Sequence, residues 1–62
     1  MWAIIDKINK QVIGYLEPIA TQEAIDQTLE THDLILMTEK NSPAYVLGYY
    51  IDGKFTRPNE GQ

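Results

Sequence analysis

Apolar or β-favouring residues gather in five short runs along this chain, and one segment between them has the spacing of a helix. The runs lie at residues 2–5, 12–16, 34–37, 45–51 and 54–56, and most are rich in β-branched and aromatic residues that favour extended backbone. Residues 22–32 follow Thr21, a good N-cap, and contain neither proline nor glycine. The order β-β-α-β-β-β predicts an α+β fold: a small antiparallel sheet of four to five strands with one helix packed on a face.

Turn residues indicate where these elements end. Asp52-Gly53 is a favoured pair for a two-residue hairpin loop, so it predicts a hairpin between the last two runs. Gly14, inside the second run, indicates a bulge or the close approach of another group, because glycine otherwise weakens a strand. We expect residues 1–57 to form a single α+β domain and residues 58–62 to be a frayed tail.

The size of the chain bears on how it is stabilised. It has 62 residues, 44% of them hydrophobic, and no cysteine. A domain of this length buries only about 60% of the surface that its unfolded chain exposes, and no disulfide is available to support the core. We therefore expect a homo-oligomer, with a dimer as the first expectation.

The charge of the chain disfavours several classes of partner. The formal net charge is −4, whereas nucleic-acid binding requires a basic patch that releases counterions from phosphates. Anionic membrane surfaces are disfavoured for the same reason, and no apolar run approaches the roughly 18 residues of a membrane helix. The first residues also lack a signal peptide's basic flank and long apolar stretch. We expect no direct nucleic-acid or membrane partner, and a cytoplasmic location.

The acidic residues are concentrated in the middle of the chain. Residues 11–39 carry six of the nine acids and no lysine or arginine. Four of these acids, three or four positions apart, form one stripe on the predicted helix, opposite its apolar side. The stripe comprises Glu23, Asp26, Glu30 and Asp33. Two interpretations remain open: a solvated face that keeps the protein soluble, or a protein-binding surface for a basic partner.

The aromatic residues predict an interface. Strand alternation over residues 45–51 would place Tyr45 and Tyr49 on one face and Tyr50 on the other, so both faces are apolar. One helix can cover only one of them, and tyrosine and tryptophan are enriched at binding hot spots. The alternative is that the rings fill the core. The expected interface comprises Trp2, Tyr15, Tyr45, Tyr49, Tyr50 and Phe55.

Catalytic chemistry finds little support in the residue types. The chain has no cysteine, one serine (Ser42) and one histidine (His32), and no spacing favours a triad. His32 adjoins Asp33, but neighbouring helical residues point about 100° apart and do not converge on one metal ion. The glycines are scattered, and none precedes the helix as a phosphate-binding loop would. We expect a protein that is not an enzyme and that binds neither metal nor cofactor.

Two motifs carry a resemblance to a group of viral proteins. The opening DKxNKxV pattern is formed by Asp6, Lys7, Asn9, Lys10 and Val12, and the closing pattern by Tyr50, Asp52, Gly53, Lys54, Phe55 and Pro58. The chain resembles small bacteriophage-encoded proteins that begin with such a hairpin and end with an aromatic-Asp-Gly-x-Phe-x-x-Pro element, and that occur among tail and accessory gene products. Here Ile51 separates the aromatic residue from the aspartate, which departs from that pattern.

The resemblance implies a viral protein that acts in the cytoplasm of a bacterial host. Together with the acidic stripe and the tyrosines, it favours a non-enzymatic accessory protein that binds a host protein, as an inhibitor or adaptor directed at antiviral defence. A virion tail or assembly component is the alternative. A third hypothesis is an oligomeric sponge that binds a nucleotide through Tyr49, Tyr50 and Lys54.

Overall fold

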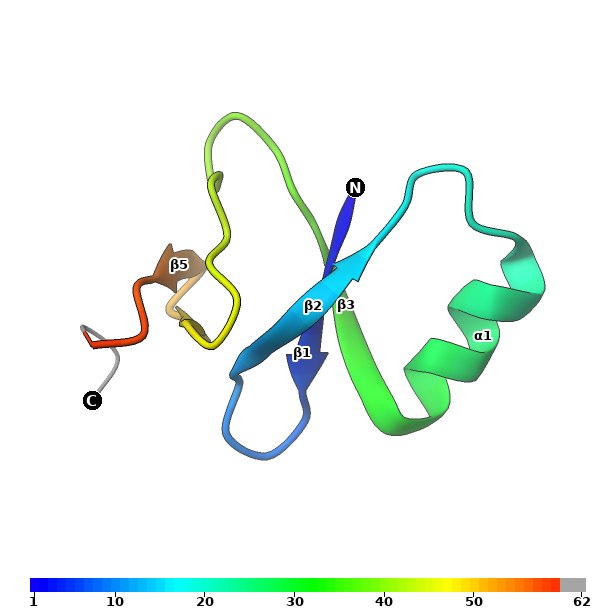
Figure 1. Ribbon diagram of the computed structural model, residues 1–62, viewed down its shortest axis with the longest axis horizontal. Helices are drawn as coiled ribbons and strands as arrows, with labels where there is room; N and C mark the ends of the chain where they lie inside the picture. Colours follow the sequence, from blue (N-terminus) through cyan, green and yellow to red (C-terminus); the bar gives the residue numbers. More distant parts are fainter. Residues whose placement is uncertain (60–62) are drawn as a thin grey trace.

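The computed structural model describes residues 1–59, and within them the chain forms one helix and five strands in two antiparallel sheets (Figure 1). One sheet has the order β2-β1-β3 and the other is the hairpin β4-β5. The elements are β1 (Trp2–Asp6), β2 (Val12–Leu16), α1 (Gln22–Thr31), β3 (His32–Leu36), β4 (Tyr49–Ile51) and β5 (Lys54–Thr56). The predicted α+β class and element order are confirmed, but the strands divide between two sheets.

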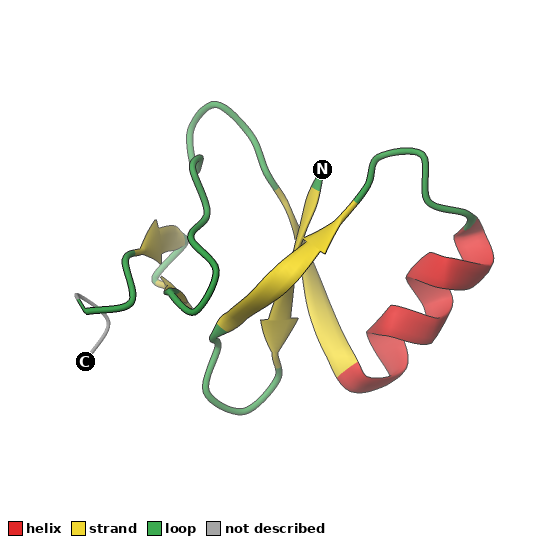
Figure 2. Cartoon of the chain, in the orientation of Figure 1, coloured by secondary structure: helices red, strands yellow, loops and turns green. Residues whose placement is uncertain are grey.

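The three-stranded sheet lies between two outer layers, the β4–β5 hairpin on one side and α1 on the other (Figure 2). Residues paired across antiparallel strands share a face of the sheet. Ala3 and its partner Ile35 therefore lie on one face with Ile5, and this face packs against the hairpin. Ile4 and its partner Leu34 lie on the other face, toward α1. As predicted, one helix packs on one face of the sheet.

The core forms on the hairpin side of the sheet. Its buried members are Ala3, Ile5, Val12 and Ala44, and the half-buried residues around them are Ile35, Met37, Tyr50 and Phe55. The rings of Tyr50 and Phe55 pack tilted against each other, with their centroids 4.9 Å apart. Such pairs stabilise a core by about 0.5–1.5 kcal/mol beyond the area that they bury. The hairpin is therefore part of the folded core.

The two sheets meet at the start of β2. A bridge pairs Gln11 with Tyr49, and the Val12 N–H donates to the Gly48 carbonyl oxygen at 2.8 Å. The Leu47 N–H donates in turn to the Val12 carbonyl oxygen at 2.7 Å. We call β4, β5 and the segment at residues 40–48 that precedes them the hairpin layer. These bonds attach the hairpin layer to the three-stranded sheet through the backbone, in addition to the apolar contacts of the core.

The predicted strand over residues 45–51 is wrong for its first half. Residues 45–48 form a turn, in which the Gly48 N–H donates to the Tyr45 carbonyl oxygen at 2.8 Å. Leu47 has φ 69°, a left-handed conformation that cannot continue a strand. The expected alternation of Tyr45 and Tyr49 on one face of a strand is therefore wrong as well.

Helix α1 begins as predicted and ends one residue early. The Thr21 hydroxyl oxygen accepts a hydrogen bond from the Ala24 N–H at 3.2 Å, which caps the first turn. At the other end, the His32 N–H donates to the Thr28 carbonyl oxygen, and the chain passes directly from α1 into β3. No residue of α1 is buried. The helix therefore lies on the sheet without contributing to the core.

Both turn predictions are confirmed. Asp52 and Gly53 have φ 52° and 78° and connect β4 to β5, which matches a type I′ hairpin turn. The register between β1 and β2 shifts so that Ile13, next to Gly14, has no partner in β1, which is a bulge. Of the predicted frayed tail at 58–62, residues 58–59 lie in a turn and residues 60–62 lie outside the described residues.

Candidate functional site

Three of the four predicted stripe residues form an acidic ridge on the outer side of α1, which we define as Glu23, Asp26 and Glu30. All three are exposed, whereas Ala24 and Ile25 are half-buried. Glutamines on the same helix hold two of the carboxylates: the Gln22 side chain donates to Asp26 at 2.9 Å, and the Gln27 side chain to Glu23 at 3.5 Å. The ridge therefore faces solvent, and two of its three carboxylates accept hydrogen bonds from side chains of the same helix.

Asp33 does not belong to the ridge, and its placement on the helix is wrong. It lies in β3 and pairs with Ile5, on the hairpin side of the sheet. Its carboxylate forms ion pairs with the Lys7 Nζ at 3.1 Å and the Lys10 Nζ at 3.6 Å. The hydrogen bond from Lys7 is the largest of the effects that lower the pKa of the Asp33 carboxyl below its ordinary value. Asp33 therefore joins β3 to the β1–β2 turn.

Asp6 has a conformational role at the same turn. Its carboxylate accepts hydrogen bonds from the Ile8 N–H at 2.8 Å and the Asn9 N–H at 3.1 Å. These two bonds, that of Asn9 first, lower the pKa of the Asp6 carboxyl. The aspartate at the start of the DKxNKxV pattern thus shapes the turn.

The six predicted interface aromatics have different environments in the fold. Tyr50 and Phe55 pack in the core, which is the alternative that the sequence left open. The Tyr15 hydroxyl donates to the Ala44 carbonyl oxygen at 2.7 Å, and the Tyr45 ring lies 5.5 Å below the Arg57 guanidinium. The other two, Trp2 and Tyr49, are half-buried, and Trp2 lies on the helix side of the sheet. The six residues are therefore divided between the two sides of the three-stranded sheet, and the interface stays a prediction.

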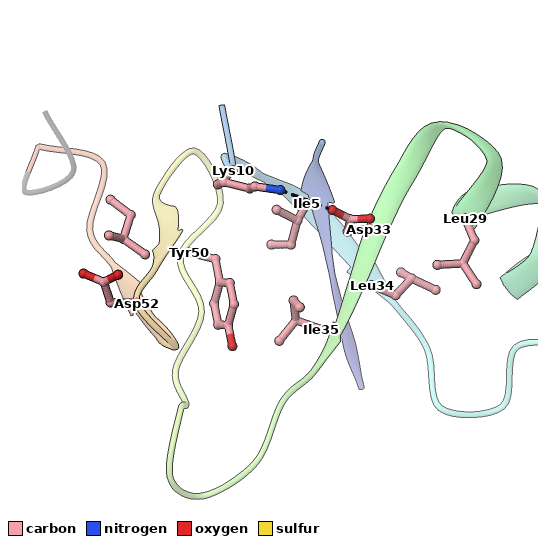
Figure 3. A pocket seen from close by; sticks show the side chains of 9 residues that line it. Ile5, Lys10, Leu29, Asp33, Leu34, Ile35, Tyr50 and Asp52 are labelled. Atoms are coloured by element: carbon pink, nitrogen blue, oxygen red, sulfur yellow. Dashed lines mark ion pairs between the residues drawn. The ribbon is translucent and has the colours of Figure 1, made fainter. Parts of the chain in front are cut away.

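An apolar hollow of about 580 Å³ opens along β3, between α1 and the hairpin (Figure 3). Leu29 stands on the helix side of β3, and Tyr50 stands on the hairpin side. The residues that line this apolar hollow are Ile5, Lys10, Leu29, Asp33, Leu34, Ile35, Tyr50, Ile51 and Asp52. The sequence did not predict it, because its walls come from four elements whose packing no local pattern encodes.

A second hollow, the basic pocket, lies on the hairpin layer. It measures about 450 Å³ and gathers three of the five bases of the chain, Lys40, Lys54 and Arg57. The other lining residues are Asn41, Ser42, Pro43, Tyr45 and Phe55. The sequence offered one signal for it, since all five bases precede or follow the acidic middle segment. The pocket offers cationic donors for an anionic group.

Within one chain, the three residues proposed to line a nucleotide-binding oligomer interface do not share a hollow. Tyr50 lines the apolar hollow, Lys54 lines the basic pocket, and Tyr49 lines neither. The His32 Nδ1 lies 2.8 Å from the Thr31 hydroxyl, and residues 1–59 contain no group of three side chains suited to hold a metal ion. Within the same residues, the helix is too short and too polar to cross a bilayer.

Comparisons with protein-family models, with curated proteins and with solved structures return no match to this chain. The acidic ridge, the apolar hollow and the basic pocket therefore have to be interpreted from their own chemistry.

Proposed function

We propose that this chain is a non-enzymatic accessory protein that acts by binding another protein through its acidic ridge. The partner in this proposal presents a basic surface to Glu23, Asp26 and Glu30. The resemblance to small bacteriophage proteins favours a bacterial host protein of antiviral defence as that partner. The chain would then act as an inhibitor or an adaptor.

The observation that supports this proposal is the separation of charge between the two outer layers. The ridge lies on α1, whereas Lys40, Lys54 and Arg57 surround the basic pocket, which includes residues of β5. Helix α1 and strand β5 lie on opposite sides of the three-stranded sheet (Figure 1). The other two bases, Lys7 and Lys10, pair with Asp33. Among residues 1–59, the ion pairs leave the ridge carboxylates without a lysine or arginine partner. Such a surface steers a basic partner toward α1 and increases the rate of association.

Charge reversal on the ridge tests the proposal. Affinity capture from a bacterial lysate identifies the partner, and the double variant Asp26→Lys with Glu30→Lys should then weaken its binding at least about tenfold. The matched control is Glu17→Lys with Glu39→Lys, which changes the net charge equally at exposed positions outside the helix. Equal binding by the two double variants would contradict a role for the ridge. Capture of a phage structural protein from a lysate of infected cells would favour the tail-assembly alternative.

The basic pocket favours a second candidate function, which is binding of a phosphate-bearing small molecule. Three cationic side chains around one hollow suit a nucleotide phosphate, and Tyr45 and Phe55 add aromatic surface. This keeps the sponge hypothesis but moves it from Tyr49 and Tyr50 to the pocket residues.

Native mass spectrometry of the purified protein tests this second candidate. Bound nucleotide should appear with the unmodified chain and disappear from Lys40→Gln with Lys54→Gln. Lys7→Gln with Lys10→Gln removes two lysines outside the pocket and should keep the ligand. A chain free of ligand that also shows no binding when titrated with ATP would contradict the hypothesis.

A further inference from the structure

The outer edge of β3 is not paired within the described part of the chain. The sheet order β2-β1-β3 leaves this edge open, and β4 and β5 pair with each other. The edge runs along the apolar hollow, between Leu29 of α1 and Tyr50 of the hairpin (Figure 3). An open strand edge is a template for pairing with a further strand, which natural proteins usually blunt with charge, proline or a cover.

The hydrogen bonds to β1 establish which backbone groups of β3 point outward. The Met37 N–H donates to the Met1 carbonyl oxygen at 2.9 Å, which continues the register in which Trp2 pairs with Leu36. In an antiparallel pair, positions that exchange hydrogen bonds alternate with positions that do not. Every second residue of β3 therefore directs its N–H and C=O away from β1, and these residues are His32, Leu34 and Leu36.

Two of these six outward groups already have partners in the same chain. The His32 N–H donates to the Thr28 carbonyl oxygen as the C-cap of α1. The Leu36 carbonyl oxygen accepts a hydrogen bond from the Asn41 side-chain amide at 3.0 Å. Within residues 1–59, the groups left over are both groups of Leu34, the His32 carbonyl and the Leu36 N–H.

The four remaining groups of one chain are complementary to the same four groups of a second copy. We propose that β3 of a second copy of this chain pairs antiparallel with β3 of the first, about a two-fold axis at Leu34. The Leu34 N–H of each copy donates to the Leu34 carbonyl of the other, and each Leu36 N–H donates to the His32 carbonyl of the other. All the open groups are then satisfied, and the result is a continuous six-stranded sheet.

A second copy fits this edge better than a strand from another protein. A general antiparallel strand would present an N–H opposite Leu36 and a C=O opposite His32. The groups that they would meet are already bonded to Asn41 and Thr28. In a second copy, the corresponding groups are engaged in the same way within their own chain. Self-pairing therefore avoids the cost of leaving polar groups without a partner at a buried edge.

The side chains beside the edge agree with this arrangement. Leu34 would lie across from its copy on the helix side, next to the exposed Leu29. On the hairpin side, Ile35 of the second copy would lie across from Asp33, at the apolar hollow. The Asp33 carboxylate is held by its own Lys7 and Lys10, so pairing does not isolate a charge. The strand that completes the hydrogen bonds thus also brings an apolar side chain to the hollow.

The two-fold symmetry of the proposed dimer determines on which side the acidic ridges and the basic pockets lie. A two-fold axis through an antiparallel strand pair is perpendicular to the sheet, so equivalent layers fall on the same side. Both α1 helices, and with them both acidic ridges, would face one way, and both basic pockets the other. The dimer would therefore present two ridges to a partner, although its formation does not depend on the ridge.

Sedimentation equilibrium over a range of protein concentrations tests the proposal. The unmodified chain should approach a dimer mass, and Leu34→Pro should weaken dimerisation at least about tenfold because it removes the central donor. Proline is tolerated at a position whose N–H faces outward from a sheet, so β3 should keep its pairing with β1. Leu16→Ala, which alters a side chain on the far strand β2, is the control and should leave the dimer mass unchanged.

A charge-swap experiment tests the register and does not depend on the proline variant. Leu34→Lys and Leu34→Glu place like charges across the axis, so each variant alone should be monomeric. An equimolar mixture should recover the dimer, because opposite charges then face each other. In amide hydrogen exchange, Leu34 and Leu36 should gain protection as concentration rises, whereas His32 should be protected throughout.

Three outcomes would overturn the proposal. One is a monomer mass for the unmodified chain at every concentration, and another is a dimer that the Leu34 variants leave intact. The third is a mixture of Leu34→Lys and Leu34→Glu that stays monomeric while the unmodified chain dimerises. None of these measurements involves a partner protein, so they are independent of the test of the acidic ridge.

Discussion

The two outer layers of this molecule are attached to the same sheet in different ways. The hairpin layer covers buried side chains and is bonded to β2 through the backbone of Leu47 and Gly48. The helix layer has no buried residue, and a hollow of about 400 Å³ lies between α1 and the sheet. A chain of this size concentrates its packing on one face of the sheet. The other face carries a helix that contacts the sheet through half-buried residues and continues directly into β3.

This difference separates stability from recognition. The hairpin layer should determine whether the chain folds, because burial of apolar surface is the main stabilising contribution. The helix layer carries the acidic ridge and can tolerate changes at its surface, because few of its contacts support the core. Substitutions should therefore cost most in the hairpin layer and least on the helix.

The largest expected effect comes from Gly48→Ala. A Cβ at this position would overlap the Thr56 carbonyl oxygen and approach the Tyr45 carbonyl oxygen to 2.9 Å, so the backbone has to move. We expect a loss of at least about 3 kcal/mol, which lowers the thermal midpoint by at least about 12 °C. Thermal unfolding followed by circular dichroism measures this loss.

Gly14→Ala is the matched control for this substitution. A Cβ at Gly14 would meet no atom within 4 Å, so the change should be close to neutral. Equal losses at Gly48 and Gly14 would show that Thr56 of β5 does not lie in close contact with the turn at residues 45–48.

The second prediction compares the loss of stability when one isoleucine on each side of the sheet is truncated. Ile5 is 1% exposed in the core, whereas Ile25 on α1 is half-buried. Ile5→Ala should cost about 2–5 kcal/mol, and Ile25→Ala about 1 kcal/mol or less. Urea unfolding of both variants measures the difference. Equal costs would mean that the helix side packs as well as the hairpin side and would remove the distinction between the layers.

Local chemistry in the sequence predicted much of the fold. Thr21 identified the start of α1, and Asp52-Gly53 identified the hairpin, because capping and type I′ turns depend on a few neighbouring residues. The strand over 45–51 was wrong because Leu47 adopts a conformation that leucine rarely takes in isolation. Long-range hydrogen bonds to Val12 and the close approach of Thr56 to Gly48 impose this conformation on Leu47. The local sequence pattern indicates neither contact.

The candidate site was predicted less completely than the fold. Helical spacing correctly placed Glu23, Asp26 and Glu30 on one exposed face, because that periodicity is local. It wrongly included Asp33, since the chain changes from helix to strand at His32 without a glycine or proline to mark the boundary. The apolar hollow and the basic pocket depend on the packing of distant segments, which hydrophobic pattern alone does not specify.

A smaller effect is expected at the cap of the helix layer. Thr21→Ala removes the acceptor for the Ala24 N–H and should cost about 1 kcal/mol. The loss should be concentrated in α1, so amide exchange should accelerate in the first helical turn while the core amides change less. Thr21→Ser keeps a hydroxyl and is the control. A uniform acceleration across all elements would show that α1 is coupled to the core more tightly than its exposure indicates.

The smallest expected effect concerns the exposed ion pairs of Asp33. The pKa of this carboxyl is lowered in the folded chain, first by the hydrogen bond from Lys7. A lowered folded pKa contributes stability above the unfolded value of about 3.9, and that contribution is lost as the pH falls through the folded pKa. Lys7→Gln should therefore raise the pKa of Asp33 and flatten the dependence of stability on pH below about 4.

Carboxyl carbon NMR titration measures this change directly. Asp6 provides an internal reference, because N–H groups of Asn9 and Ile8 are the main cause of its lowered pKa, and Lys7→Gln retains them. Lys54→Gln, on the hairpin layer, is the control variant and should leave both carboxyls unchanged. If the pKa of Asp33 did not rise in Lys7→Gln, the contact between β3 and the β1–β2 turn would be a weaker constraint than its 3.1 Å distance indicates. The acidity of Asp33 would then have to come from Lys10 alone.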